Sequence, residues 1–547
     1  MNSRYSLILL GLIPILFMII FFYFPLASIL KDSFSANIIQ ILFDSNNLKI
    51  WRFTFIQAIL STIISLAIGL PAGYLFGRYE FRCKRFLLAF LTVPFVLPGV
   101  FVALGVITVL GPNGLIAFVI NTIIPENIAF GWIGIMYAHA FYNIPLIIHW
   151  TSSSLTQSDP EVEEVAKSLG SKGWHKFKRI ILPTMLPGII VGCLLTFIFC
   201  FLSFPVVKIL GGINLRTMEV HIASTYKTFP LTGKPIAASL ALMQFLVMFV
   251  FVYLYMRSLK RVTERKRVGR SAVKKLPNLN ETKPLVKTLI VVYFGFLILF
   301  NSLLFLGIMN KSLRNQFTNT LTLENYNTIF SFVPSRFLGV GPLRSVFNSF
   351  FFAFSSVYIA AVLGLCTLFL REKMKGKSSV LFDTFIFLPL TASAITLALG
   401  MVRAFHSTDI FYSDVWFFII IAHSLISFPF MMRAFANAKD RVDPDLIETS
   451  RGLGAKRLET FFRIELPLML PTILIGLSFT FAMSIGEFTA TNFLWEPKAT
   501  TMSVAIYRFI SMRQWGPASA MSVLVGLVCF VSFLIIYKLS EEEMRIF

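Results

Sequence analysis

Twelve long apolar stretches, each about as long as a bilayer crossing, constrain this chain more than any other feature. A spanning helix needs roughly 20 apolar residues, because each residue rises about 1.5 Å through a hydrocarbon core of about 30 Å. The chain is therefore expected to be an all-α polytopic membrane protein. The stretches lie near residues 6–30, 53–77, 86–110, 129–150, 187–209, 236–257, 286–309, 345–370, 379–403, 415–435, 471–495 and 517–539.

Composition supports a membrane protein and weakens several other classes. Of 547 residues, 56% are hydrophobic and only 14% are charged, which is far too apolar for an ordinary soluble domain. The formal net charge of +22 could suggest nucleic acid, but the basic residues gather in particular loops. The cysteines form no C-x-x-C pair and have no histidine cluster beside them, so no metal site or disulfide is expected. They are Cys83, Cys193, Cys200, Cys366 and Cys529.

The basic loops predict an orientation, because short cytoplasmic loops of membrane proteins are enriched in Lys and Arg. RYEFRCKR (78–85), the segment from Arg257 to Lys287 and REKMKGK (371–377) all follow even-numbered stretches. A cytoplasmic N-terminus places all three inside, and the C-terminus with them. The first stretch exceeds the short core of a cleavable signal peptide, so it is expected to remain as a helix.

Two polar loops, 151–186 and 436–470, occupy equivalent places in the two series of stretches. From Asp159 the first reads DPEVEEVAKSLGSKGWHKFKRIILPTMLP, and from Asp443 the second reads DPDLIETSRGLGAKRLETFFRIELPLMLP. At a constant offset of 284 residues, 14 of 29 positions are identical. Ala103-Leu104-Gly105 also returns as Ala398-Leu399-Gly400.

This repeat divides the chain into two homologous halves with the same predicted orientation, which is a parallel repeat. The first half is expected at 1–257 with loop 151–186, and the second at 286–547 with loop 436–470. Residues 258–285 form a basic linker between them, expected to be cytoplasmic.

Local chemistry predicts a compact helix-turn-helix knob in each loop. We call 151–186 the first knob and 436–470 the second knob. The aspartates at the start can cap a helix whose first turn takes the following proline. Gly170 and Gly454 then supply the conformation that ends this helix. A second short amphipathic helix is expected to follow, with Pro183 and Pro467 marking its exit toward the next span.

The pattern of glutamate, two small residues, glycine and Ile-x-Leu-Pro resembles the EAA loop of ABC importer permeases. In that family a short coupling helix fits a groove on a separate ATPase subunit. The copies read Glu-Val-Ala and Glu-Thr-Ser in place of Glu-Ala-Ala, which keeps the glutamate. The ATPase-coupling residues that the resemblance implies are Asp159, Glu164, Ala166, Gly170, Ile180, Leu182, Pro183, Asp443, Glu448, Ser450, Gly454, Ile464, Leu466 and Pro467.

The resemblance also implies the partners and the location. Two copies of an ABC ATPase would dock from the cytoplasm, and an extracytoplasmic substrate-binding protein would deliver the solute. The expected location is the bacterial cytoplasmic membrane. No G-x-x-x-x-G-K-[ST] phosphate loop occurs, so ATP and Mg²⁺ are expected on the ATPase and no cofactor on this chain. We therefore predict a transport subunit without its own nucleotide site.

The solute is predicted from the fifth stretch of each half. FLSFPVVKILGGINLRTMEVHIASTY (201–226) looks like thiamine permeases, and SIGEFTATNFLWEPKATTMSVAIYRF (484–509) looks like iron permeases. Glu487 is an acid inside an apolar stretch, and such carboxylates are functional candidates because burying them is costly. Its repeat partner is Ser203, so both are assigned to a solute pathway. Polyamine, sulfate or phosphonate cargo stays open, as does a packing role for Glu487, and His139 and His423 are interpreted as packing residues.

Other classes fit less well. A secondary transporter of two parallel six-helix halves would place its largest cytoplasmic motif between helices 2 and 3, where this chain has only RYEFRCKR. A membrane enzyme would need clustered His, Asp or Glu with catalytic spacing, which the sequence lacks. Nucleic-acid binding is excluded in practice, because the basic residues follow the topology.

Overall fold

The computed structural model describes residues 12–34, 38–112, 114–116, 128–156, 165–166, 168–171, 173–212, 214–229, 233–268, 278–279, 282–336, 338–371, 374, 377–408 and 413–546. Helices dominate these ranges, and the extended pairing within them is limited to two isolated bridges, Glu80 with Asn278 and Arg314 with Leu321. The expectation of an all-α membrane protein is confirmed.

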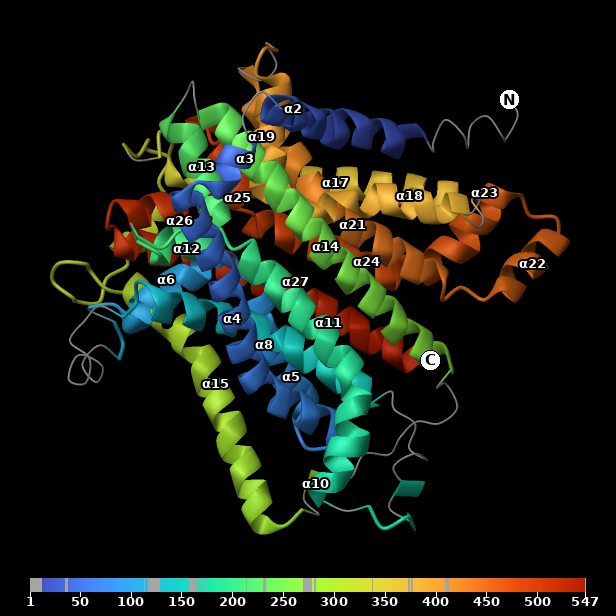
Figure 1. The fold of residues 1–547 in the computed structure, drawn as a ribbon. Helices are drawn as coiled ribbons and strands as arrows, with labels where there is room; N and C mark the ends of the chain where they lie inside the picture. The colour runs from blue at the N-terminus through green and yellow to red at the C-terminus, as the bar shows by residue number, and fades with distance from the viewer. Residues whose placement is uncertain are drawn as a thin grey trace. The chain divides into compact units, whose positions relative to one another are not determined.

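The first series of helices corresponds to the first repeat (Figure 1). Its elements are η1 (Ile19–Tyr23), α2 (Phe24–Phe34), α3 (Ile38–Phe43), α4 (Ser45–Arg78), α5 (Lys84–Thr92), η2 (Val93–Val96), α6 (Gly99–Leu110), α8 (Trp132–Thr156), α10 (Gly173–Lys176), η3 (Phe177–Ile181), α11 (Leu182–Phe201), α12 (Pro205–Leu210), α13 (Met218–Thr228) and α14 (Gly233–Val268).

The second series repeats this order. Its elements are α15 (Pro284–Ser312), α16 (Glu324–Ile329), α17 (Pro342–Arg371), α18 (Lys377–Phe387), η5 (Leu388–Thr391), α19 (Ala394–Phe405), α21 (Val415–Lys439), α22 (Pro444–Gly452), α23 (Arg457–Thr460), η6 (Phe461–Glu465), α24 (Leu466–Gly486), α25 (Thr489–Leu494), η7 (Pro497–Ala499), α26 (Met502–Ser511) and α27 (Trp515–Ile546).

Nine helices of the described chain are long and apolar enough to cross a membrane, and a bent pair makes a tenth. The bent pair is 84–96 with 99–110, which turns by 104°. Prolines explain the bend, because Pro94 is the second residue of the 3₁₀ turn η2 and Pro98 precedes α6. Pro389 is likewise the second residue of the 3₁₀ turn η5 between α18 and α19. The remaining expected stretches are α8 and the α18–α19 pair.

The chain divides into two compact units that exchange helices between the repeats. One unit contains residues 1–41, 222–245 and 311–547, and the other contains 42–221 and 246–310. The first span thus belongs with the second repeat, and most of α15 belongs with the first. The boundaries at 257 and 286 describe the sequence repeat and stay predictions.

Two helices, α2 and α15, each belong to the compact unit of the other repeat, and we call them the exchanged helices. Each packs against the glycine of one copy of the repeated Ala-Leu-Gly. A Cβ atom on Gly105 would lie 2.9 Å from Leu304 Cγ of α15. On Gly400 it would lie 3.0 Å from Pro25 Cβ of α2. Glycine is needed at both places because it lets two helix backbones approach closely. The repeated Ala-Leu-Gly therefore lies at equivalent contact sites for the two exchanged helices.

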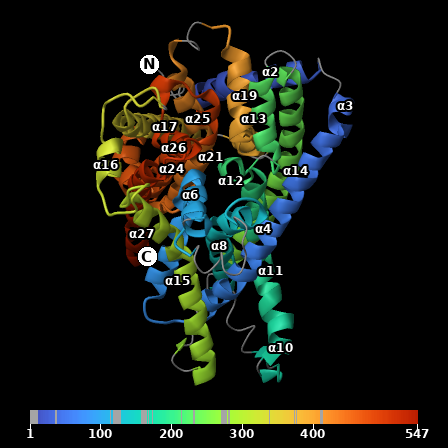
Figure 2. The same ribbon diagram turned by 90° about the vertical axis from the view of Figure 1, so that its left-hand side faces the viewer.

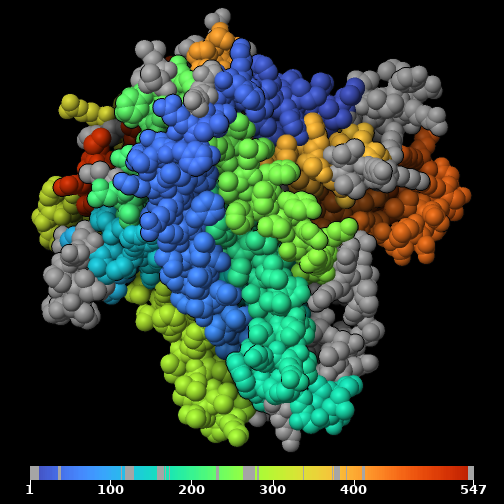
Figure 3. Space-filling model, in the orientation of Figure 1, coloured from blue at the N-terminus to red at the C-terminus, as the bar shows by residue number. Residues whose placement is uncertain are grey.

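Helix α4 shows how the spans divide their faces. Ser61 and Ser65 are fully buried, whereas Ile59 and Ile63 are exposed, as expected for a lipid-facing surface. Figures 1 and 2 show α4 beside α8, and Figure 3 shows α4 as a broad blue strip of the surface. The contact is close because three glycines at four-residue spacing face α8: Gly69, Gly73 and Gly77.

Candidate functional site: two knobs and two broken spans

The second knob begins as its sequence predicts. Asp443 is the N-cap of α22, and its carboxylate accepts a hydrogen bond of 3.0 Å from the backbone N–H of Asp445. Pro444 occupies the first turn, where its missing N–H leaves no helical bond unmade. Glu448 is exposed on this helix. In Figure 1 the orange helices α22 and α23 extend beyond the ends of α21 and α24.

Both knobs turn on a glycine in the left-handed region. Gly170 has φ of +79° and Gly454 has φ of +89°. The backbone N–H of Ser171 donates to the Ala166 carbonyl at 2.9 Å, and Ala455 donates in the same way to Ser450 at 3.2 Å. This six-to-one bond is that of a Schellman cap. The predicted stop at each glycine is confirmed, while Asp159 and Glu164 lie outside the described residues.

The expected second helix of each knob is not a separate element. After a four-residue helix the chain makes a π turn, η3 or η6, and continues without a break into the fifth span. Pro183 and Pro467 therefore lie inside a continuous helix instead of marking an exit. Proline has no N–H and crowds the carbonyl four residues earlier, and the wider π turn relieves that conflict.

The remaining coupling residues occupy matching environments in the two knobs. Ala166 and Ser450 are buried against the knob interior, and the Ser450 hydroxyl lies 3.0 Å from that of Thr460. The Ile-x-Leu-Pro residues follow the same pattern, half-buried for isoleucine and leucine and exposed for proline. They are Ile180, Leu182, Pro183, Ile464, Leu466 and Pro467.

Sequence reasoning missed the apolar side chains at the tip of each knob. Leu169 and Leu453 precede the turn glycines at equivalent positions and are 82% and 85% exposed. Trp174 and Leu458, also equivalent, are 74% and 61% exposed. Because burial of a leucine or tryptophan is favourable by about 2 kcal/mol, these exposed side chains are candidates for contact with a partner. Equal offset and apolar character in both copies could have identified them.

The fifth span of each half is broken where Ser203 and Glu487 lie. Helix α11 ends at Phe201 and α12 begins at Pro205, while α24 ends at Gly486 and α25 begins at Thr489. The apolar stretches at 187–209 and 471–495 are thus each interrupted by one of these breaks. About 20 helical residues, roughly 30 Å, separate each break from its knob. The knob residues and the pathway residues therefore form separate sites.

Glu487 is buried and held on several sides. Its carboxylate accepts hydrogen bonds from the backbone N–H groups of Ala490 at 2.8 Å and Thr491 at 3.0 Å. It also accepts the Thr491 hydroxyl at 2.8 Å and lies 3.3 Å from His423 Nε2. These contacts close the chain break by capping α25 and joining it to α21.

Ser203 makes the corresponding contact in the first half. Its hydroxyl lies 2.8 Å from His139 Nε2, and His139 Nδ1 lies 2.8 Å from the Ser61 hydroxyl. His139 and His423 are both buried, and they join the fourth span to the break in both halves. The two breaks are thus built alike, but the group beside the histidine is a hydroxyl in the first half and a carboxylate in the second.

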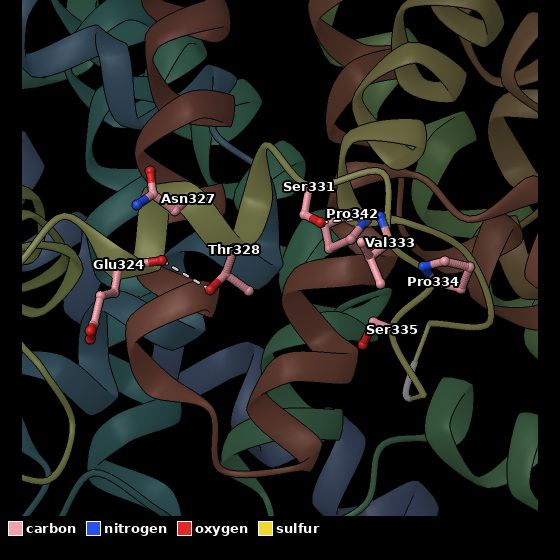
Figure 4. A pocket seen from close by; sticks show the side chains of 8 residues that line it. All are labelled: Glu324, Asn327, Thr328, Ser331, Val333, Pro334, Ser335 and Pro342. Carbon is pink, nitrogen blue, oxygen red and sulfur yellow. Dashed lines mark hydrogen bonds between the residues drawn. The ribbon is translucent and has the colours of Figure 1, made fainter.

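A cavity of about 480 Å³ lies beside α16, at the end of α17 remote from the second knob (Figure 4). It opens between α16 and the first residue of α17, and the labelled Thr328 hydroxyl is satisfied by the Glu324 carbonyl at 2.9 Å. None of the residues that the sequence assigns to ATPase coupling or to the solute pathway lines this cavity. The lining residues are Glu324, Asn327, Thr328, Ser331, Val333, Pro334, Ser335 and Pro342.

Comparison with known proteins agrees with the doubled architecture. The model of the family "Binding-protein-dependent transport system inner membrane component" matches twice, at residues 69–267 and 356–546. A ferric transport system permease protein, FbpB, of Actinobacillus pleuropneumoniae is 25% identical over 90% of this chain and 71% of its own length. The thiamine transport system permease protein ThiP of Haemophilus influenzae is 23% identical over 90% of this chain and 88% of its own length.

Proposed function

Because this chain belongs to the family of binding-protein-dependent transport system inner membrane components, and is thus a permease of an ABC importer, we propose that it carries ferric iron or thiamine inward. The similar ferric and thiamine permeases support this choice of solutes. We propose that a substrate-binding protein delivers the solute from outside and that two ATPase subunits drive the transport.

The observation that supports this function best is the pair of exposed knob tips. Leu169 and Leu453 project from two turns with the same Schellman bond and the same left-handed glycine. Two equivalent apolar tips suit two copies of one partner, and an ATPase dimer provides two copies of one groove. The π turn behind each tip joins it directly to the fifth span, which supplies a rigid path from ATPase to membrane.

For orientation, we propose that both knobs and both termini face the cytoplasm. Cysteine labelling in a background without native cysteines tests this with Lys172→Cys and Lys456→Cys. Both positions should react with a membrane-impermeant maleimide only after the membrane is opened. Labelling of either position in intact cells would contradict the proposed topology.

Within the membrane, we propose that Ser203 and Glu487 lie beside the solute pathway and shape the breaks of the fifth spans. Their support is positional, since they are equivalent residues at the two breaks. The hydrogen bonds of Glu487 to α25 support a carboxylate that organises the break, and uptake by variants of Glu487 tests whether it also contacts the solute.

Co-purification with the ATPase tests the docking assignment. Leu169→Asp and Leu453→Asp together should lower ATPase recovery at least tenfold, because each places a charge on an apolar contact. Leu323→Asp is the matched control, since Leu323 is 65% exposed at the N-terminal end of α16, outside both knobs. Normal ATPase recovery with the double variant would contradict the assignment. Uptake of labelled ferric iron and of labelled thiamine by the assembled importer then separates the solutes.

A further inference from the structure

The two knobs are fastened at the base by different chemistry. In the second knob, Lys439 is the last residue of α21 and Glu465 is the last residue of the π turn η6. The Lys439 ammonium donates to the Glu465 carboxylate, whose side chain is only 6% exposed. This ion pair joins the helical segment that leads into the knob to the one that leads out of it.

The first knob has an apolar contact at the same place. At the offset of 284 residues, Leu155 corresponds to Lys439 and Ile181 to Glu465. Leu155 and Ile181 are buried in one apolar cluster with Met185 and Ile189. The same joint is therefore ionic in one half and hydrophobic in the other.

These contacts differ in how they resist movement. A partly buried ion pair has a preferred distance and direction, so sliding one helix past the other separates the charges in a medium of low dielectric constant. An apolar contact is non-directional and keeps much of its energy when the surfaces shift slightly. A force on the second knob should therefore reach its span through this contact without slippage, whereas the apolar contact at the same place in the first knob allows more movement.

We propose that Lys439 and Glu465 are positioning residues that lock the second knob to its span, so that the two ATPase contacts are mechanically unequal. This inference rests on the proposed docking of an ATPase to both knobs. The ion pair sets how much solute moves for each ATP hydrolysed, while the apolar base of the first knob accommodates the accompanying shift.

The test replaces the ion pair of the second knob with the apolar residues found at the same positions of the first knob. Lys439→Leu with Glu465→Ile should keep thermal stability and ATPase recovery, because apolar residues of similar volume commonly substitute for a buried ion pair. The solute imported per ATP in proteoliposomes should fall at least threefold. The charge-reversed pair, Lys439→Glu with Glu465→Lys, should retain near-normal coupling, which a purely steric role for these positions would not predict.

The outcomes separate this inference from the proposed function. Wild-type solute per ATP in the apolar double variant would overturn the lock. So would uncoupled transport by a charge-reversed variant of normal stability. Failure of the unaltered chain to recover the ATPase at all would instead refute the docking on which the inference rests. Lys31→Leu, at an exposed position of α2 outside both knobs, is the control for simple loss of a positive charge.

Discussion

The two halves share their elements in order, yet contacts that are charged in the second half are neutral at equivalent places in the first. Besides the knob base, Arg371 donates to Asp383 at 3.2 Å between α17 and α18. At the offset of 295 that aligns the two Ala-Leu-Gly sequences, these positions are Phe76 and Leu88. Both belong to one apolar cluster.

The contact sites of the two exchanged helices also differ in being charged in one case and neutral in the other. Arg403 of α19 binds Asp32 of α2 through two guanidinium nitrogens, with 3.0 Å between Nη2 and Oδ1. The counterpart of Arg403 is Thr108, which meets the backbone of α15 at Gly307, where a Cβ would lie 2.7 Å from the threonine hydroxyl. One exchanged helix is held by charge and the other by close backbone approach.

Duplication thus preserved shape while allowing the contact chemistry to diverge. Apolar packing and ion pairs can give the same helix arrangement, but they differ in the response to a single substitution. Removing one partner of a buried pair leaves an uncompensated charge, whereas trimming an apolar residue costs mainly its contacts. The second half should therefore be the more sensitive to single substitutions at these places.

The largest effect is expected where the halves do not differ. Gly170→Val and Gly454→Val each place a β-branched residue at positive φ, a strain of at least about 1 kcal/mol that falls on the turn presenting the leucine tip. Among the residues that the structure describes, none lies within 4 Å of a Cβ at either site, so strain and not collision is the cause. Uptake and ATPase recovery should each fall more than tenfold for either variant and be lost in the double.

Gly452→Ala is the matched control, because Gly452 has an ordinary backbone conformation and equal space around it. It should transport normally. Full uptake by the Gly170→Val, Gly454→Val double variant would remove the coupling role of both knobs.

Breaking the ion pair between Asp32 of α2 and Arg403 should lower the stability of the protein. Asp32→Asn leaves Arg403 partly buried beside a neutral amide, at a cost of about 2 kcal/mol in the free energy of unfolding. Thermal unfolding in nanodiscs measures the effect as a lower midpoint. Lys31→Gln, an exposed neighbour on the same helix, should leave the midpoint unchanged. An equal midpoint for Asp32→Asn would show that this pair adds nothing to the stability.

The charged break of the second half can be compared directly with the neutral one. Glu487→Gln replaces one carboxylate oxygen with an amide nitrogen, which cannot accept a hydrogen bond, so the N–H of either Ala490 or Thr491 loses its acceptor and the start of α25 is weakened. Uptake should change several-fold while membrane insertion and ATPase recovery stay normal. Ser203→Ala, the counterpart in the first half, should have a smaller effect because it removes a neutral hydroxyl. Unaltered uptake in Glu487→Gln would make it a packing residue only.

The sequence predicted those features that depend on local chemistry. Apolar length located the spans, and the Asp443 cap and the glycine turn at Gly454 follow from the preferences of single residues. The breaks at Ser203 and Glu487 were not predicted, although Pro205 inside an expected span is a sign of one. Helix exchange and the ion pairs depend on which distant segments meet, and apolar length, motif spacing and the preferences of single residues do not report that.

The smallest effect is expected at Ser450, where the second knob departs from the alanine of the first. Ser450→Ala installs the residue found at Ala166 and removes one buried hydroxyl contact, 3.0 Å from Thr460. The Thr460 hydroxyl can still bond to the carbonyl one turn earlier in its own helix, so the loss should not exceed about 1 kcal/mol. ATPase recovery and uptake should stay within twofold of the unaltered chain, as measured beside Gly454→Val in the same preparation. A tenfold loss would mean that the serine of Glu-Thr-Ser is itself required for docking, and that the two knobs differ at the interface as well as at the base.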